Sequence, residues 1–294
     1  MKALICKWCG ANYSRRPCEA DKSKFCSRVC QLESKKVIIS PPTDRKMEII
    51  NGALLSDGSI ENSKKSNYHF CETHCLADKE YVEWMSAELG DWVSSINDGF
   101  SNYNGKKYLK SRLACHNHVM WNELRQKWYP NGIKIVPKDL QLTPLTLACW
   151  HCGDGTNDPK TGVIELLTCG FTLDDVEFLR AELYKLDIDT TIKFDRRFKK
   201  PYPIIYVRSI SYLPFMELVK PHIVCDCMQR KVTMSDWVKN HRRFRRWATF
   251  VFEDGTIHRV DNIAKFARNH NVNVDGLYSL VFKRTKNYKG WTIP

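Results

Sequence analysis

Two aspartates stand in nearly the same sequence context at two places in the chain. Asp57 ends a run of apolar and small residues that begins at Ile49, and Asp154 ends a similar run that begins at Thr146. They lie 97 positions apart, and each is followed by glycine and a hydroxyl residue. A single Asp-Gly dipeptide is ordinarily a turn, but the paired copies predict two carboxylates in one site. Carboxylate oxygens suit Mg²⁺, so the pattern predicts a metal site for phosphodiester hydrolysis.

A helix is expected to carry each aspartate. Thr43 can cap a helix over about 44–56, and Thr143, followed by Pro144 in the first turn, can cap the second helix. Small residues recur four apart near each helix end, on one face where two helices can pack closely; they are Gly52, Ser56, Cys149 and Gly153. The glycine after each aspartate is expected to stop its helix. Helix C-termini also present free carbonyls, which favour cations.

The elements after each motif repeat in the same order. The first motif is followed by an alternating strand over 67–75 and a helix over 79–89; the second is followed by a strand over 162–169 and a helix over 173–186. β-rich stretches at 107–115 and 190–210 come next, and each precedes another helix. Each half therefore has the pattern α-β-β-α-β-β-α, which predicts an α+β fold built from a duplicated domain.

Four cysteines near the N-terminus have the spacing of a zinc site. The pattern is C-x2-C-x16-C-x3-C, formed by Cys6, Cys9, Cys26 and Cys30. Two such pairs can converge as four thiolates around a tetrahedral Zn²⁺. Gly10 can supply the positive φ that the first knuckle needs, while Cys18 either replaces one of the four or is an idle thiol. A segment this small needs the metal to fold.

A second group of histidines and cysteines lies in the strand that follows the first motif. Alternation along the strand puts His69, Cys71, Thr73 and Cys75 on one face and His74 on the other. One hypothesis is that the residues on the first face form a second metal site. The alternative is that these side chains contact a bound ligand.

The chain as a whole is basic. It has 46 Lys+Arg against 33 Asp+Glu, a formal net charge of +13 over 294 residues. This surplus favours a polyanionic partner, because each cation on a phosphate releases counterions; a basic protein without such a partner is the alternative. Neither a signal peptide nor a stretch of about 20 apolar residues is evident, so no membrane association is expected. Thirteen cysteines then indicate metal-bound and free thiols in a reducing cytoplasm.

The last 58 residues, from position 237 to 294, change in composition. Basic and aromatic residues interleave from Lys239 to Trp247, which suits contact with a phosphate backbone; a solvated helix face is the alternative. Asp254-Gly255 predicts a hairpin within 250–260. Two short helices are predicted over 262–269 and 274–282, followed by a basic segment.

Both motif copies resemble the LAGLIDADG motif of homing endonucleases, and the resemblance extends over about 47–232. The segment 134–140 resembles the approach to the second motif in single-chain members of the family. The resemblance implies a saddle of two antiparallel sheets along the DNA major groove and a staggered double-strand cut with Mg²⁺ or Mn²⁺. Asp57 and Asp154 match the family's metal-binding acids, and Ser56 and Gly153 are implied beside them in the metal site. The chain departs from the motif where the family has its earlier, non-essential aspartate, since Leu55 and Cys152 stand there.

The resemblance also implies roles for polar residues around the site. By strand register, His74, Thr168 and Lys193 are candidates for ordering water near the metals. Contact with DNA is predicted for His69, Cys71, Thr73, His74, Lys193, Arg196, Arg197, Arg208, Arg242, Arg243, Arg245, Arg246, Lys283, Arg284 and Lys286. The C-terminal segment resembles the helix-turn-helix modules that phage and intron-borne nucleases carry.

These observations predict four segments: a zinc-finger-like module over 1–36, two halves over 44–135 and 136–236, and a basic linker with a helix-turn-helix over 237–294. The predicted function is a monomeric, site-specific endonuclease of double-stranded DNA with a long target. An intron RNA maturase or a non-cleaving DNA-binding regulator on the same core is the main alternative. A zinc-dependent transcription factor is the third. Retention of both Asp57 and Asp154 favours cleavage.

Overall fold

The computed structural model describes residues 1–7, 10–33, 39–62, 67–103, 105–195, 201–236, 238, 248–260 and 262–294. The chain divides into two compact units, Met1–Pro41 and Pro42–Pro294. Within the described ranges, no helix is both long and apolar enough to cross a membrane.

The N-terminal unit is built around a short antiparallel hairpin. Strand β1 (Lys2–Ile5) pairs with β2 (Asn12–Arg15), and the short helices α1 (Pro17–Ala20) and α2 (Arg28–Glu33) follow. Gly10 has φ +72°, as predicted, and it donates its backbone N–H to the Cys6 carbonyl at 3.0 Å. Cys6 and Ala20 are the buried apolar residues among those described in this unit. Such a small apolar core agrees with a fold that needs a metal.

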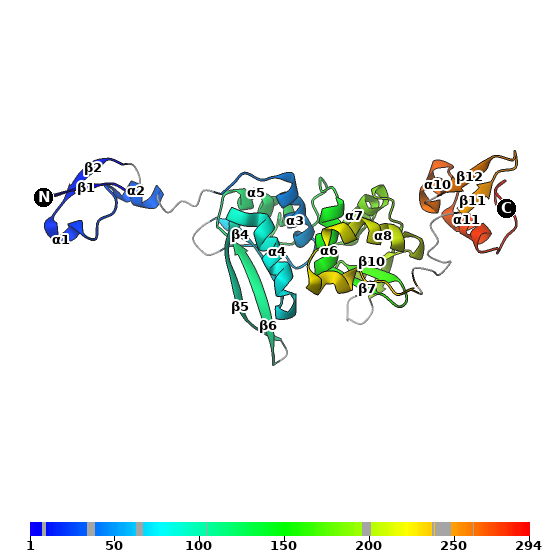
Figure 1. Ribbon diagram of the computed structural model, residues 1–294, viewed down its shortest axis with the longest axis horizontal. Helices are drawn as coiled ribbons and strands as arrows, with labels where there is room; N and C mark the ends of the chain where they lie inside the picture. The colour runs from blue at the N-terminus through cyan, green and yellow to red at the C-terminus, as the bar shows by residue number, and fades with distance from the viewer. Residues whose placement is uncertain are drawn as a thin grey trace. The chain divides into compact units, whose positions relative to one another are not determined.

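The second unit contains the duplicated domain, and both halves have the predicted order (Figure 1). The first half consists of α3 (Asp44–Leu54), β3 (Ser59–Asn62), β4 (Tyr68–Cys75), α4 (Lys79–Leu89), β5 (Val93–Tyr103), β6 (Lys106–Cys115) and α5 (Met120–Trp128). The second half consists of α6 (Pro144–Asp154), β7 (Gly155–Asp158), β8 (Val163–Leu167), α7 (Leu173–Lys185), β9 (Thr190–Asp195), β10 (Tyr202–Val207) and α8 (Tyr212–Val219).

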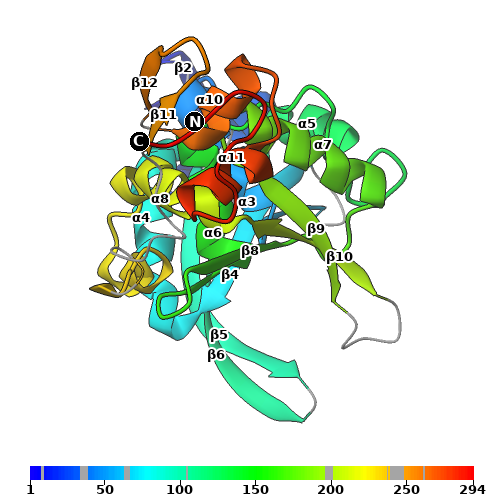
Figure 2. The same ribbon diagram turned by 90° about the vertical axis from the view of Figure 1, so that its right-hand side faces the viewer.

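Each half forms one four-stranded antiparallel sheet, in the orders β3-β4-β6-β5 and β7-β8-β10-β9. Helices α4 and α5 pack on the first sheet, and the residues beneath them alternate along β4 as Phe70, Glu72 and His74. Strand β5 is polar and glycine-containing, and the predicted order of elements included it without giving it a range. It pairs with β6 in a long hairpin that extends past the helices (Figure 2).

The two motif helices, α3 and α6, lie side by side at the join of the halves (Figure 1). Thr43 and Thr143 cap them as predicted, by accepting the N–H of Lys46 and of Thr146 respectively. A Cβ on Gly52 would lie 2.6 Å from the Cβ of Cys149, and a Cβ on Gly153 would lie 2.6 Å from that of Ser56. The four predicted small residues therefore meet in two pairs, one from each helix.

Helix α6 ends at Asp154, directly before Gly155, as predicted, whereas α3 already ends at Leu54, before Gly58. Neither glycine has the left-handed conformation that is common at helix C-termini. Gly155 has φ −81° and extended backbone, and Gly58 is absent from the residues with positive φ. Both positions need a residue without a side chain for another reason. A Cβ on Gly58 would lie 2.8 Å from the Ala53 carbonyl oxygen, and one on Gly155 would lie 2.0 Å from Nδ1 of His151.

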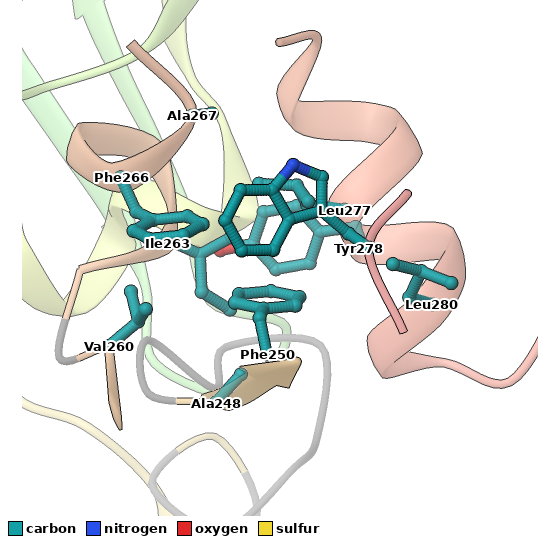
Figure 3. Packing of buried hydrophobic residues seen from close by; sticks show 10 residues of the cluster. Ala248, Phe250, Val260, Ile263, Phe266, Ala267, Leu277, Tyr278 and Leu280 are labelled. Carbon is teal, nitrogen blue, oxygen red and sulfur yellow. The ribbon is translucent and has the colours of Figure 1, made fainter. Parts of the chain in front are cut away.

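The C-terminal module has its own apolar core (Figure 3). Strands β11 (Ala248–Val251) and β12 (Ile257–Val260) form the predicted hairpin, and helices α10 (Ile263–Asn269) and α11 (Val274–Val281) follow. Phe250 stacks on Phe266 with ring centroids 5.3 Å apart, and Trp291 packs edge-on against both rings. Asn262 and Asn273 cap the two helices. The two predicted short helices are thus present.

Candidate functional site

The packing of α3 on α6 brings the two aspartates to the same end of the helix pair. Asp57 follows the last turn of α3, and Asp154 is the last residue of α6. A Cβ on Gly153 would lie 3.4 Å from Oδ2 of Asp57, so the Asp57 carboxylate reaches the end of the opposite helix. The small-residue pairs therefore bring the two carboxylates to one place, which is the arrangement that a composite site requires.

The electrostatics of this site disfavour the charged form of Asp154. Burial, and after it the neighbouring Asp57 carboxylate, raise the pKa of Asp154 to about 6, although Lys134 and Lys231 oppose the effect. The side chain of Asp57 is 43% exposed, while Asp154 is half-buried. Two carboxylates in this proximity suit a bound cation, because a cation would offset both the repulsion and the lost hydration.

Two lysines that sequence reasoning missed lie at the ends of the motif helices. The ammonium group of Lys134 donates to the carbonyls of Ser56 (3.0 Å) and Gly58 (2.9 Å). Lys231 does the same at the carbonyls of Gly153 (3.4 Å) and Gly155 (2.6 Å). The signal was available, since Lys231 follows Lys134 by 97 positions, the interval that separates the aspartates.

These contacts place a positive charge beside each aspartate. Burial lowers the pKa of Lys134 to about 8, although the carboxylates of Glu72, Asp154 and Asp57 oppose the effect. Burial likewise lowers the pKa of Lys231. The ammonium groups also donate hydrogen bonds to the carbonyls of Ser56 and Gly153. These are the two residues predicted beside the aspartates in the metal site. The Ser56 hydroxyl is turned back onto its own helix, where it donates to the Gly52 carbonyl at 3.3 Å.

The first half has an additional polar pair beside Asp57. His74 is 7% exposed, and its Nδ1 lies 3.8 Å from Asp57 Oδ2 while its Nε2 lies 2.7 Å from Glu72 Oε1. Burial opposes protonation, but the hydrogen bond and charge of Glu72 outweigh it and raise the pKa of His74. Glu72 is 2% exposed and was not predicted; its Oε2 has no hydrogen-bond partner among the described residues.

His74 and Thr168 occupy equivalent strand positions but have different surroundings. The pairing of Ser59 with Cys71 corresponds to that of Thr156 with Glu165, which makes Thr168 the counterpart of His74. The Thr168 hydroxyl is buried and donates to the Pro203 carbonyl at 2.5 Å. Thr168 therefore has a packing role in place of the predicted water-ordering role. His74 lies on the helix-facing side of β4, beside Asp57, which excludes the base contact predicted for it.

The opposite face of β4 carries the other residues of this strand that are predicted to contact DNA. His69 and Thr73 are half-buried there, but Cys71 is 1% exposed and therefore not available to DNA. Glu61, His69 and Cys71 have ligand atoms within 4.8 Å of one another. Arg112 already places its guanidinium 2.7 Å from Glu61 and 3.2 Å from the Cys71 sulfur. This internal cation argues against the second metal site.

Strand β6 adds basic residues that sequence reasoning missed. Arg112 pairs with Thr73, and Lys110 pairs with Cys75, so both project on the face away from the helices. The same alternation adds Tyr108 and Lys106 toward the tip of the hairpin, where both are exposed. Buried Ser111 and Leu113 occupy the other face. The alternation in Lys106–Cys115 was the available signal, and it gives one ladder of basic and aromatic side chains.

In the second half the predicted DNA contacts have different outcomes. Lys193 pairs with Ile204 on the face opposite Ile205, which is fully buried, and its ammonium lies 3.1 Å from the ring centroid of Tyr206. Arg208 forms an ion pair with Asp275 of the C-terminal module, so its charge is already neutralised.

The basic residues predicted to contact DNA after α11 are exposed and available to a ligand; they are Lys283, Arg284 and Lys286. The remaining predicted arginines lie outside the described residues; they are Arg196, Arg197, Arg242, Arg243, Arg245 and Arg246.

The N-terminal thiols converge as predicted. The sulfur atoms of Cys6, Cys26 and Cys30 all lie within 4.8 Å of one another, with Cys26 and Cys30 3.4 Å apart. Cys9 lies outside the described residues, and Cys18 is exposed on α1. Three converging thiols are a donor set that Zn²⁺ accepts, with one position left for a fourth ligand.

Comparisons with known proteins agree with this arrangement. The LAGLIDADG DNA endonuclease family matches residues 47–215. An uncharacterised protein of Methanocaldococcus jannaschii is 32% identical over 185 residues, which cover 59% of this chain and 68% of that protein. A probable intron-encoded endonuclease of Wickerhamomyces canadensis is 30% identical over 60% of this chain and 79% of its own length.

Two further relatives bear on function. A cytochrome b mRNA maturase of Debaryomyces hansenii is 29% identical over 67% of this chain and 78% of the relative. The homing endonuclease I-WcaI, solved bound to its DNA recognition sequence, is 26% identical, with a TM-score of 0.61 over 70% of this chain and 93% of that one. With the family match over more than half of its length, this chain belongs to the LAGLIDADG DNA endonuclease family.

Proposed function

We propose that Asp57 and Asp154 form the composite active site with which this site-specific DNA endonuclease cuts both strands of its target. The observation that carries the assignment is the packing of Ser56 on Gly153, which joins the ends of α3 and α6. I-WcaI is similar to this chain and was solved on its DNA recognition sequence, so double-stranded DNA with a specific site is the partner. One chain supplies both halves of the site, and a monomer is therefore sufficient.

The site suits a divalent cation, which we propose to be Mg²⁺ or Mn²⁺. The raised pKa of Asp154 reflects its burial and the neighbouring Asp57 carboxylate, and carboxylates are the ligands such ions prefer. The bound cation would supply Lewis-acid chemistry and an activated water. The chain's own contribution is to hold both carboxylates together, while Lys134 and Lys231 place ammonium groups where charge develops on the phosphate.

The deciding experiment is cleavage of DNA that flanks the gene, with Mg²⁺ present. We expect wild type to give a double-strand cut, and Asp57→Asn and Asp154→Asn each to reduce the rate by about 10³-fold, which corresponds to several kcal/mol of lost charge stabilisation. Asp174→Asn, an exposed aspartate away from the site, is the matched control and should cut normally. If wild type binds a candidate site and cuts neither strand, the nuclease assignment fails.

RNA maturation is the second candidate function, because a 29% identical relative is named as an mRNA maturase. Intron splicing in vitro would separate the two activities. A maturase role predicts that Asp57→Asn still promotes splicing, because RNA folding does not need phosphodiester hydrolysis by the protein. Loss of splicing together with cleavage would argue against an independent maturase surface.

For the N-terminal unit we propose a structural Zn²⁺ site formed by Cys6, Cys9, Cys26 and Cys30. Three of these sulfur atoms already converge. Zinc content should fall from one equivalent to near none in Cys26→Ser and Cys30→Ser, with Cys18→Ser as the control. Unchanged zinc in the first two variants would exclude the site. Metal-bound thiols also fit the reducing intracellular location that we propose for the protein.

We further propose that the sheets form a saddle on DNA and that the C-terminal module is a helix-turn-helix that extends the footprint. The β6 ladder of Lys106, Lys110 and Arg112 supports the first proposal, and exposed Lys283 and Lys286 support the second. Removing one cation that binds a phosphate should reduce the slope of log affinity against log salt by about 0.9. Lys283→Ala and Lys286→Ala should therefore each lower that slope, whereas Lys2→Ala should not; an unchanged slope would contradict the module's role.

A further inference from the structure

We propose that His151 is a positioning residue that holds Lys231 at the second aspartate, an inference that rests on the proposed nuclease function. His151 lies in α6, three residues before Asp154. It has no counterpart in the first half, where Leu54 occupies the equivalent position, 97 residues earlier. His151 is a buried polar side chain that the cleavage chemistry does not itself use.

The His151 ring is fixed in one orientation. Its Nε2 lies 2.9 Å from the Lys231 carbonyl oxygen, and a carbonyl can only accept, so Nε2 carries the hydrogen. The residue is fully buried, and the ring packs edge-on against Phe215 with centroids 5.1 Å apart. Gly155 completes the pocket, because a Cβ there would lie 2.0 Å from Nδ1.

Lys231 is anchored through its backbone, whereas its ammonium group, at the far end of the side chain, lies at the site. It ends the short helix η5 (Asp226–Lys231). Glu80 of the first half fixes the start of η5 by accepting the N–H groups of Asp226 (3.1 Å) and Cys227 (3.0 Å). Glu80 holds the start of η5 and His151 holds its end. The Cα of Lys231, from which the side chain extends, therefore has a fixed position. Its ammonium then reaches the carbonyls of Gly153 and Gly155.

Lys134, the matching lysine, is held without an imidazole. The next residue, Ile135, donates its N–H to the Trp128 carbonyl at 2.8 Å, and Leu54 contributes only apolar surface. Loss of the His151 hydrogen bond should therefore loosen one lysine and leave the other unchanged. A residue with a merely structural role would disturb both lysines together through the shared helix interface.

The first test needs no DNA. Competitive acetylation with acetic anhydride, read by mass spectrometry, compares Lys231 with Lys134 in the same full-length molecule. In His151→Leu, which installs the residue of the first half, we expect the Lys231-to-Lys134 reactivity ratio to rise by about fivefold, the size of a lost neutral hydrogen bond. His151→Gln, whose amide nitrogen can replace Nε2, should keep the wild-type ratio. An unchanged ratio in His151→Leu would overturn the inference even if the nuclease assignment stands.

The second test uses DNA substrates pre-nicked in one strand or the other, so that each strand is timed alone. His151→Leu should change the ratio of the two strand rates by about tenfold, and the double variant with Lys231→Met should be no slower than Lys231→Met alone. Leu54→Met is the matched control and should leave the ratio unchanged. Equal slowing of both strands, or additive effects in the double variant, would refute the positioning role. Failure of wild type to cut either substrate would instead refute the proposed function.

Discussion

The two halves of the duplicated domain share the same pair of charged residues but differ in the side chains around that pair. Each half contributes an aspartate at a helix end and a lysine that bonds the carbonyls before and after that aspartate. Around this shared arrangement the halves diverge. Asp57 has His74 and Glu72 nearby, whereas the positions equivalent to these two residues carry Thr168 and Leu166.

The comparison separates the features that the two halves repeat from those that they do not. Charge is repeated at the same spacing in both halves, and Asp57, Lys134 and Lys231 all lie close enough to Asp154 to act on its pKa. The neighbouring residues differ between the halves: Leu54 only fills space, whereas His151 also holds the backbone of Lys231. The two halves should therefore share one chemistry but cut their strands at different rates, and the following predictions test that comparison.

The largest effect should come from removing one lysine charge. Lys134→Met and Lys231→Met should each slow cutting of at least one strand by about 10²–10³-fold, the effect of losing one preorganised donor for developing charge. Strand-specific rates on a radiolabelled duplex provide the measurement. Lys107→Met, an exposed lysine on the helix-side face of β6, is the control. If either active-site variant cuts both strands at the wild-type rate, the equivalence of the lysines is broken.

The next effect concerns the close approach of the two motif helices. Gly52→Ala should lower the free energy of unfolding by about 3 kcal/mol or more, and Gly153→Ala by about 1–2 kcal/mol. A Cβ on Gly52 would meet the Thr146 backbone oxygen at 2.4 Å, whereas one on Gly153 would meet side-chain atoms of Ser56; the hydroxyl can rotate away, but the Ser56 Cβ at 2.6 Å has to shift. Urea unfolding measures both.

Two variants check that prediction. Gly99→Ala is the control, because no atom lies within 4 Å of the added methyl group. Combining Gly153→Ala with Ser56→Gly should restore most of the lost stability. If the double variant is no more stable than Gly153→Ala alone, the Ser56–Gly153 contact is not what sets the helix spacing.

A third effect is a gain in stability. Because the pKa of Asp154 is about 6 in the fold against an ordinary 3.8, the folded state binds this proton more tightly than the unfolded state. The charged carboxylate therefore destabilises the fold above pH 6, and that cost disappears as the pH falls toward 4. Asp154→Asn should raise the free energy of unfolding at pH 8 by about 1–2 kcal/mol, discounted for partial exposure. The gain should shrink at pH 4.5.

Asp57→Asn provides the comparison, and its gain should be smaller because the Asp57 side chain is 43% exposed. Added Mg²⁺ should stabilise wild type and close the gap to Asp154→Asn, since ligand binding to the folded state raises its stability. Equal unfolding free energies for wild type and Asp154→Asn at pH 8 would show that the carboxylate is not under electrostatic strain.

The sequence was most informative where local rules act. The caps Thr43 and Thr143, the small-residue faces and the order of elements depend on residues close in the chain, and all were predicted. Strand β5 was given no range because its polar, glycine-containing sequence gains its structure from pairing with β6. Glu72 was missed because a buried carboxylate has no local signature; its surroundings include Tyr81 of α4, Cys149 and Cys152 of α6, and Lys134. Lys134 and Lys231 could have been found by applying the 97-residue interval to every charged residue.

The smallest effect compares the two helix caps. Thr43 is exposed and accepts one N–H, from Lys46. Thr143 accepts the N–H of Thr146 at 3.1 Å, and its hydroxyl also contacts that of Thr146, which in turn donates to the Glu48 carbonyl of the first half. Thr43→Ala should therefore cost about 0.5–1 kcal/mol and Thr143→Ala about 1–2 kcal/mol. Serine at either position keeps the oxygen and should recover most of the loss in urea unfolding. Equal costs would mean that the hydroxyl chain from Thr143 to Glu48 adds nothing to the joining of the halves, which would then depend on the glycine contacts alone.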